Sequence, residues 1–226
     1  MRNLILIHGA LGHAKHFDAL CDLLKDAYQL HVIELPAHGQ NQEHVDFSIP
    51  GFSNYVAEYI QQHHLEAAGI FGYSMGGYIA LHLAHQHPEL VSKVMTLATK
   101  FDWNAQDTQQ QVAMLNPDKM LEKVPQYVES LKAQHPATDW RQLLNKTAEL
   151  MMQISQQAYL NDEVFQQLNL PVRIGRGDHD KMVSLQETAA VYEKLPQGSL
   201  YILPDTPHPI EKISVELMAP QIRNFF

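Results

Sequence analysis

The stretch Gly72-Tyr73-Ser74-Met75-Gly76 joins two segments of opposite character. The short apolar run AAGIF (67–71) precedes it and is typical of a buried strand, whereas YIALHLAHQH (78–87) follows with the apolar spacing of a helix. A serine between two such segments, with glycines two residues before and two after, is typical of a sharp turn that holds the hydroxyl at the carboxyl edge of a sheet. The simpler alternative is a glycine-rich turn in which Ser74 only caps the helix.

Short apolar runs alternate with amphipathic stretches on both sides of this junction. The alternation predicts βαβ units, and therefore an α/β fold whose mostly parallel sheet is flanked by helices. We expect strands at residues 4–7, 30–35, 68–71, 91–98, 172–175 and 199–203, and helices at 16–26, 52–63, 74–87, 185–194 and 210–226.

Residues 101–169 interrupt this rhythm, because they carry helical patterns and no convincing strand. Asn116-Pro117-Asp118 has the cap, the proline and the acid of a helix start, and a second helix is expected from near Thr138 to beyond Met152. We therefore predict an α/β core made of residues 1–100 and 170–226. A helical lid, residues 101–169, is inserted in it after the fourth strand.

Composition narrows the class of protein further. The 226 residues carry a formal net charge of −9 and no basic cluster, which disfavours nucleic acid as a partner. Cys21 is the single cysteine, so no internal disulfide forms and a reducing compartment is expected. Only four apolar residues precede His8, too few for a secretory signal, and no run reaches membrane-spanning length. We expect a cytoplasmic protein that acts on a small molecule; its oligomeric state stays open.

Two further motifs follow the first two expected strands. His8-Gly9-Ala10-Leu11-Gly12 follows the first, and Glu34-Leu35-Pro36-Ala37-His38-Gly39 follows the second. With the serine turn and an acid and a histidine near the C-terminus, they make the sequence resemble the α/β-hydrolase-fold superfamily over nearly the whole chain outside the insert. The resemblance implies that Ser74 is a nucleophile at a nucleophile elbow. It also implies that the backbone amides of Ala10 and Met75 form an oxyanion hole.

The order of catalytic residues in this superfamily is serine, acid, histidine. His208 lies between the last expected strand and the last helix, where the family keeps its base. Two acids compete for the third place. Asp180 fits the family spacing G-x-x-D-x-x-V through Gly177 and Val183, and Asp178 is the alternative.

The remaining histidines receive structural roles. Three of them, His82, His85 and His87, are expected on a polar helix face. No glutamate accompanies them in the H-E-x-x-H arrangement of zinc proteases, so no metal site is predicted. His8 and His38 are expected to make structural hydrogen bonds.

With Ser74, His208 and an aspartate in these places, the resemblance implies a serine hydrolase. Such an enzyme would cleave a small to medium carboxylic ester or thioester through an acyl-enzyme, without a cofactor. Two alternatives stay open: a cofactor-free C–C hydrolase or lyase of the same fold, and a ligand-binding protein that retains the three residues. The large side chains of the insert are expected either to pack the lid or to line a substrate pocket. They are Phe101, Trp103, Met114, Met120, Tyr127, Trp140, Met151 and Met152.

Overall fold

A computed structural model describes residues 1–65 and 67–226 of the chain. In this part of the chain, six strands pair in parallel in the order β2-β1-β3-β4-β5-β6. The predicted α/β fold is therefore confirmed. The strands are β1 (Arg2–Ile7), β2 (Tyr28–Ile33), β3 (Ala68–Tyr73), β4 (Val91–Leu97), β5 (Val172–Gly177) and β6 (Gly198–Leu203).

Helices connect the strands and cover both faces of the sheet. The α-helices of the body are α1 (Asp18–Leu24), α2 (Ile49–Gln62), α3 (Met75–Gln86), α9 (Leu185–Tyr192) and α10 (Val215–Phe225). Short 3₁₀ turns are η1 (Ala14–Phe17), η2 (Pro88–Leu90) and η3 (Ile210–Lys212). Between β4 and β5 come α4 (Ala105–Met114), α5 (Pro117–Lys123), α6 (Pro125–Gln134), α7 (Trp140–Gln156) and α8 (Asp162–Gln167).

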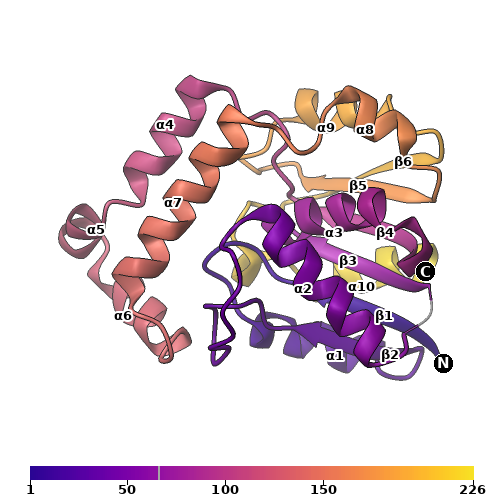
Figure 1. Ribbon diagram of the computed structural model, residues 1–226, viewed down its shortest axis with the longest axis horizontal. Coiled ribbons are helices and arrows are strands. Elements are labelled where there is room, and N and C mark those ends of the chain that lie inside the picture. Colours follow the sequence, from indigo (N-terminus) through magenta and orange to yellow (C-terminus); the bar gives the residue numbers. More distant parts are fainter. Residues whose placement is uncertain (66) are drawn as a thin grey trace.

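The sheet is buried on both faces, as the unbroken apolar strands predict. Alternate residues of β1 point to opposite sides, so that Ile5 and Ile7 join one apolar cluster and Leu4 and Leu6 join the other. Helices α2, α3 and α9 cover the first face, and α1 and α10 cover the second. In Figure 1, α2 and α3 lie in front of the sheet and α10 lies behind it.

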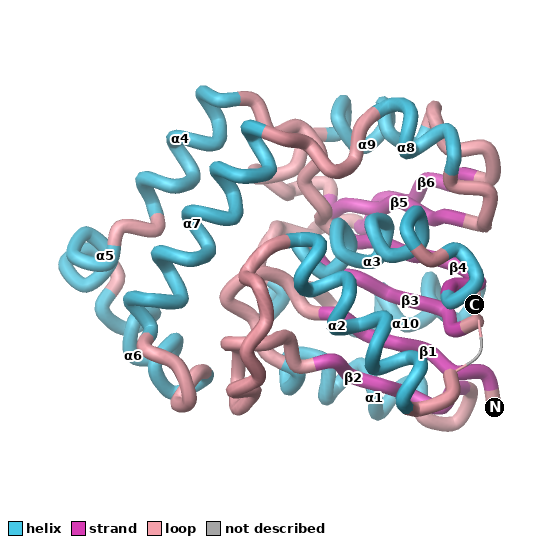
Figure 2. Tube along the Cα trace, in the orientation of Figure 1, coloured by secondary structure: helices cyan, strands magenta, loops and turns pink. Residues whose placement is uncertain are grey.

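The helical insertion after β4 is also confirmed. Helices α4 to α7 stand beyond the carboxyl ends of the strands, and α4 packs along α7 (Figure 2). Met120, Leu131 and Trp140 belong to a small apolar cluster of the lid's own. The end of the insert packs on the body instead, because Leu160 and Phe165 join the cluster of α2 and α3. The division of the chain into a core and a separate lid of residues 101–169 stays a prediction.

The strand order fixes the place of the site. The chain passes from β1 to the sheet edge at β2 and then returns to β3 on the other side of β1. The loops after β1 and β3 therefore diverge, the first to α1 on one face and the second to α3 on the other. In open parallel sheets such a point leaves a crevice at the carboxyl ends of the strands.

Several of the expected boundaries were wrong, and two elements show a physical reason. The second strand begins and ends two residues earlier than expected, because the N–H of Leu35 donates to the His8 ring and not to a neighbouring strand. The last helix does not start at 210. A 3₁₀ turn comes first, and Ser214 caps α10 by accepting the N–H of Leu217. The helix start at Asn116-Pro117-Asp118 is confirmed, since the Asn116 side chain caps α5.

Candidate active site

Ser74 occupies a strained turn between β3 and α3. Its φ of 51° and ψ of −118° lie outside the regions that non-glycine residues favour. Only glycine fits at the two flanking positions, because a Cβ at either one would collide with the backbone. A Cβ on Gly72 would come within 2.4 Å of the Gly76 carbonyl, and one on Gly76 within 2.1 Å of the Ile7 carbonyl. The turn is also pinned to β4, because the Ser74 N–H donates to the Leu97 carbonyl at 2.8 Å.

The loop after β1 lies directly against this turn. A Cβ on Gly9 would approach the Ser74 Cβ to 3.0 Å, so glycine is what lets the two backbones come together. His8 fixes the loop: its Nδ1–H donates to the Gly9 carbonyl at 2.8 Å, and its Nε2 accepts the Leu35 N–H at 3.1 Å. Burial lowers the pKa of His8 to about 3, which keeps the ring neutral and suits this pairing.

The two amides that the resemblance assigned to an oxyanion hole flank Ser74. Ala10, Ser74 and Met75 line the same cavity. Within the described residues the Ala10 N–H has no hydrogen-bond partner. Met75 is the first residue of α3, where a backbone N–H has no acceptor within the helix. Both donors are therefore free to serve a ligand at Ser74.

His208 and Asp180 complete a line of contacts that starts at Ser74. The Ser74 hydroxyl oxygen lies 3.5 Å from Nε2 of His208, and Nδ1 of His208 lies 2.8 Å from a carboxylate oxygen of Asp180. Because Asp180 accepts the Nδ1 proton, Nε2 is left as the bare nitrogen that faces the serine. The Tyr73 hydroxyl donates to the His208 carbonyl and so helps to fix the position of His208.

Hydrogen bonds to both carboxylate oxygens fix the position of Asp180. Its side chain is fully buried, and its second oxygen accepts the N–H groups of Met182 at 2.8 Å and Val183 at 2.9 Å. Burial opposes ionisation and is the largest single influence. The hydrogen bond and charge of His208, together with the two N–H groups, outweigh it and lower the pKa of Asp180. The carboxylate therefore stays charged at neutral pH.

Asp178 lies outside this line. It is exposed, and its carboxylate accepts the backbone N–H of Thr206 at 3.0 Å, which braces the loop that leads to His208. With His179 and Asp205 it forms an exposed group of three potential metal ligands among the described residues. The structure thus brings Ser74, His208 and Asp180 together and leaves Asp178 on the surface.

Three hollows meet at these residues. A narrow apolar cavity of about 40 Å³ extends from Ser74 towards α7, with Trp103, Leu150 and Met151 in its wall. A second one of about 290 Å³ also includes Ser74 and lies beside Tyr127. The third, of about 620 Å³, opens beside His208 and Met114. Four large lid residues thus line hollows, whereas Met120 and Trp140 pack within the lid.

Sequence reasoning missed two residues here. Lys100 lines the cavity beside Ser74, and a lysine placed directly after a parallel strand was a signal available in the sequence. His135 joins the lid to the body: its Nδ1 accepts the Gly39 N–H at 2.8 Å and its Nε2–H donates to the Leu11 carbonyl at 3.0 Å. Nothing in the sequence near His135 marks that role.

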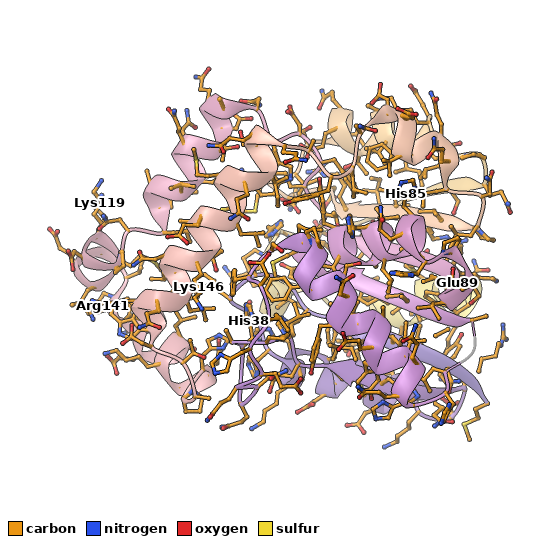
Figure 3. All side chains as sticks on the ribbon, in the orientation of Figure 1. His38, His85, Glu89, Lys119, Arg141 and Lys146 are labelled. Carbon is orange, nitrogen blue, oxygen red and sulfur yellow. The ribbon has the colours of Figure 1, made fainter. Side chains whose placement is uncertain are left out.

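Three other histidines that the sequence analysis singled out lie away from the line of contacts at Ser74. His38 is fully buried among aromatic rings and hydrogen-bonds the Pro36 carbonyl at 3.0 Å. Along α3, His82 is 7% exposed and packs edge-on against Tyr159, so it is not on a polar face as expected. It points inward because its position in the helix faces the insert. His85 lies nearer the surface (Figure 3).

Comparison with known proteins agrees with this architecture. Residues 2–133 match the family model of the α/β hydrolase fold. The chain therefore belongs to the α/β hydrolase fold family. None of the helices described is long and apolar enough to cross a membrane.

Relatives with curated descriptions match part of the chain. An uncharacterized hydrolase, YugF of Bacillus subtilis, is 33% identical over 100 residues, which is 43% of this chain and 37% of that protein. The pimeloyl-[acyl-carrier protein] methyl ester esterase of Vibrio cholerae is 30% identical over 105 residues, 46% of this chain and 40% of the esterase. The matches thus span about two fifths of each relative's length.

Solved structures match over the full length. The crystal structure of NosK from Streptomyces actuosus has a TM-score of 0.83 at 16% identity, and the alignment covers 99% of this chain and 96% of NosK. At this identity the likeness concerns the fold.

Proposed function

We propose that this protein hydrolyses small to medium carboxylic esters or thioesters through an acyl-enzyme on Ser74. The observation that supports the proposal is the line of contacts from the Ser74 hydroxyl through the His208 ring to the buried Asp180 carboxylate. A serine hydroxyl is a weak nucleophile until a base takes its proton. His208 is placed to be that base, and Asp180 to hold its tautomer and stabilise its charged form.

The reaction has two halves. The Ser74 oxygen bonds to the carbonyl carbon as its proton passes to Nε2 of His208; the bond to the leaving oxygen or sulfur then breaks, and the leaving group takes that proton. Water next attacks the acyl carbon and gives its proton to His208, and the bond to Ser74 breaks as the proton returns to the serine. The amides of Ala10 and Met75 stabilise the oxyanion in each half, by roughly 3–4 kcal/mol per donor in other enzymes.

The hollows around Ser74 support an ester whose acyl group and leaving group occupy separate hollows. The narrow apolar cavity suits an acyl chain, and the wider hollow beside Tyr127 suits the leaving group. The relative in Vibrio cholerae is named as a methyl ester esterase, which agrees with this bond type.

Carbon–carbon cleavage receives less support. Relatives that act on carboxylated substrates in this way use basic lid residues. In this lid, Arg141 stacks on the Trp140 ring at 4.4 Å and lies 3.9 Å from Asp118, at the outer end (Figure 3). Arg141 lines none of the hollows described above, and the Vibrio cholerae relative is named for an ester bond, so ester hydrolysis remains our proposal.

Covalent labelling tests the proposal. A fluorophosphonate should add one group per chain, on Ser74, because the activated serine attacks phosphorus as it would attack an ester carbonyl. Mass spectrometry locates the adduct, and short p-nitrophenyl esters report turnover. Ser74→Ala should abolish labelling and leave at most a few per cent of turnover, whereas the exposed Ser92→Ala should change neither. An adduct on another residue, or none, would refute the nucleophile.

A further inference from the structure

Lys100 enters the site from the strand next to the nucleophile. The chain leaves β4 at Leu97, and the Thr99 hydroxyl donates to the Ser74 carbonyl at 2.9 Å. The next residue, Lys100, is only 7% exposed and lines the apolar cavity that contains Ser74. A lysine is rarely buried to this degree unless its ammonium group has a partner.

The Lys100 ammonium has a charged partner but makes no hydrogen bond within the described residues. Its nearest carboxylate oxygen, on Glu187, lies 4.0 Å away, beyond hydrogen-bond distance. Glu187 is already occupied: one oxygen accepts the N–H of Phe101 at 3.0 Å, and the other accepts the N–H and hydroxyl of Ser184 at 2.9 and 3.0 Å. The Trp103 ring lies 5.9 Å from the ammonium nitrogen. Glu187 thus balances the charge and leaves the three ammonium donors unused.

Gln111 contributes a second unsatisfied polar group to the same wall. Its side-chain oxygen is buried and, among the described residues, accepts no hydrogen bond. Lys100 and Gln111 line both the cavity at Ser74 and the larger hollow beside His208, so they stand between the two. The rest of the cavity wall is mostly apolar, with Leu150, Met151 and Ile154.

We propose that Lys100 and Gln111 bind a carboxylate at the far end of the substrate's acyl chain, so that the natural substrates are half-esters or half-thioesters of dicarboxylic acids. The inference rests on the proposed ester hydrolysis and specifies its substrate class. A mostly apolar cavity with an ammonium in its wall that makes no hydrogen bond matches a methylene chain that carries an anion. Binding exchanges water on the ammonium for a charge-assisted hydrogen bond, and the amide of Gln111 can turn its NH₂ towards the second oxygen.

Two esters of equal length test the proposal. Mono-p-nitrophenyl adipate and p-nitrophenyl hexanoate differ only in the terminal carboxylate. The parent protein should have the higher kcat/KM on the adipate half-ester. Lys100→Met should lower the ratio of the two kcat/KM values about ten- to hundredfold, the range for a lost hydrogen bond to a charged group. Lys100→Arg should keep most of the ratio, since the charge remains.

A matched control separates a binding role of Lys100 from the general effect of removing a positive charge near the site. Lys181 is an exposed lysine beside Met182, and Lys181→Met removes the same charge near the site. It should change the ratio less than threefold. An equal effect of Lys181→Met and Lys100→Met would overturn the proposal. Should Lys100→Met fail to fold, as judged by circular dichroism, Lys100→Gln replaces it with the same expectation.

A binding measurement separates this inference from the proposed function. Calorimetry on the Ser74→Ala protein should detect adipate, and Lys100→Met in that background should weaken the affinity at least tenfold. Absence of fluorophosphonate labelling with Lys100-dependent adipate binding would refute the proposed hydrolysis and uphold the carboxylate site. Labelling and hexanoate turnover, with no preference for the half-ester and no adipate binding, would refute the carboxylate site alone.

Discussion

Ser74 holds a backbone conformation that no helix or strand would impose. A residue other than glycine at positive φ costs on the order of 1–3 kcal/mol and persists only where its surroundings fix it. Here the fixing contacts are the N–H bond to Leu97, the Thr99 hydroxyl bond and the close packing of Gly9 and Gly76. The strain positions the hydroxyl between the free amides and the His208 ring.

The two neighbouring aspartates should respond very differently to the same change. Asp180→Asn should lower kcat about 10⁴-fold, because an amide favours the wrong imidazole tautomer and loses the charge that stabilises the protonated ring. Asp178→Asn should lower it only a few-fold, since Asp178 braces the loop through Thr206. Steady-state kinetics with p-nitrophenyl esters measures both, and circular dichroism checks the fold. A larger loss from Asp178→Asn would reverse the assignment.

The preference for Asp180 came from a local spacing, and the structure gives its physical basis. An aspartate readily accepts N–H groups two and three residues ahead, which sets the turn and buries Val183. Lys100 could not be assigned in the same way. Its unused donors depend on Glu187, which lies 87 positions further along the chain and is itself held by Ser184. A contact between segments far apart in the chain leaves no periodic pattern in the sequence from which it could be predicted.

At the scale of elements, one histidine bonds the middle of the lid to two loops of the body. His135 follows α6 and bonds two loops of the body, one after β1 and one after β2. It is 1% exposed, and burial lowers its pKa, so the neutral ring can accept one N–H and donate the other. The loop that carries Ala10 is therefore coupled to the lid.

Replacing His135 should loosen the lid. His135→Phe keeps a flat ring but leaves the Gly39 N–H and the Leu11 carbonyl unpaired, a loss on the order of 2–4 kcal/mol. Urea unfolding should show that loss, and amide hydrogen exchange should quicken in α5 and α6. Lys119→Ala, at the exposed outer end of the lid (Figure 3), serves as the control. Unchanged stability and exchange in His135→Phe would contradict the role.

Most elements could be predicted from apolar periodicity, because strands buried on both faces read as unbroken apolar runs. Two of the boundaries that were wrong lie where a side chain makes the hydrogen bond that a backbone group would otherwise make. The His8 ring replaces a strand partner for Leu35, and Ser214 starts α10 by capping. The insertion after β4 was predictable since strand patterns vanish from the insert. Its attachment through His135 was not, because that contact joins residues 96 and 124 positions apart.

At the scale of the whole molecule, several histidines are buried, and burial favours their neutral form. His8 is fully buried with a pKa of about 3, and His82 is 7% exposed with a pKa of about 4; burial is the main cause for both. The unfolded chain binds protons at these rings below pH 6.5 and the folded protein does not. The stabilisation is therefore complete above pH 6.5 and is lost as the pH falls towards 4.

This linkage predicts acid sensitivity well above the range where carboxylates titrate. Between pH 7.5 and 5.5 the two rings should each lower the free energy of unfolding by about 1.4 kcal/mol, or about 3 kcal/mol together. Urea unfolding at both pH values measures the difference. His82→Leu should reduce the difference by about 1.4 kcal/mol, whereas the exposed His44→Gln should leave it unchanged. A difference that His82→Leu does not reduce would contradict the linkage.

The insertion of the lid between two paired strands makes it exchangeable. The chain leaves the sheet at Leu97 and returns at Val172 in the neighbouring strand. Closing a flexible loop costs only about 0.6 kcal/mol more for each doubling of its length, so the sheet tolerates inserts of many sizes. Ser74, Asp180 and His208 all come from the body. A different insert that keeps a hydrogen-bond donor and acceptor in place of His135 would therefore leave the three proposed catalytic residues in place and change the side chains that line the hollows.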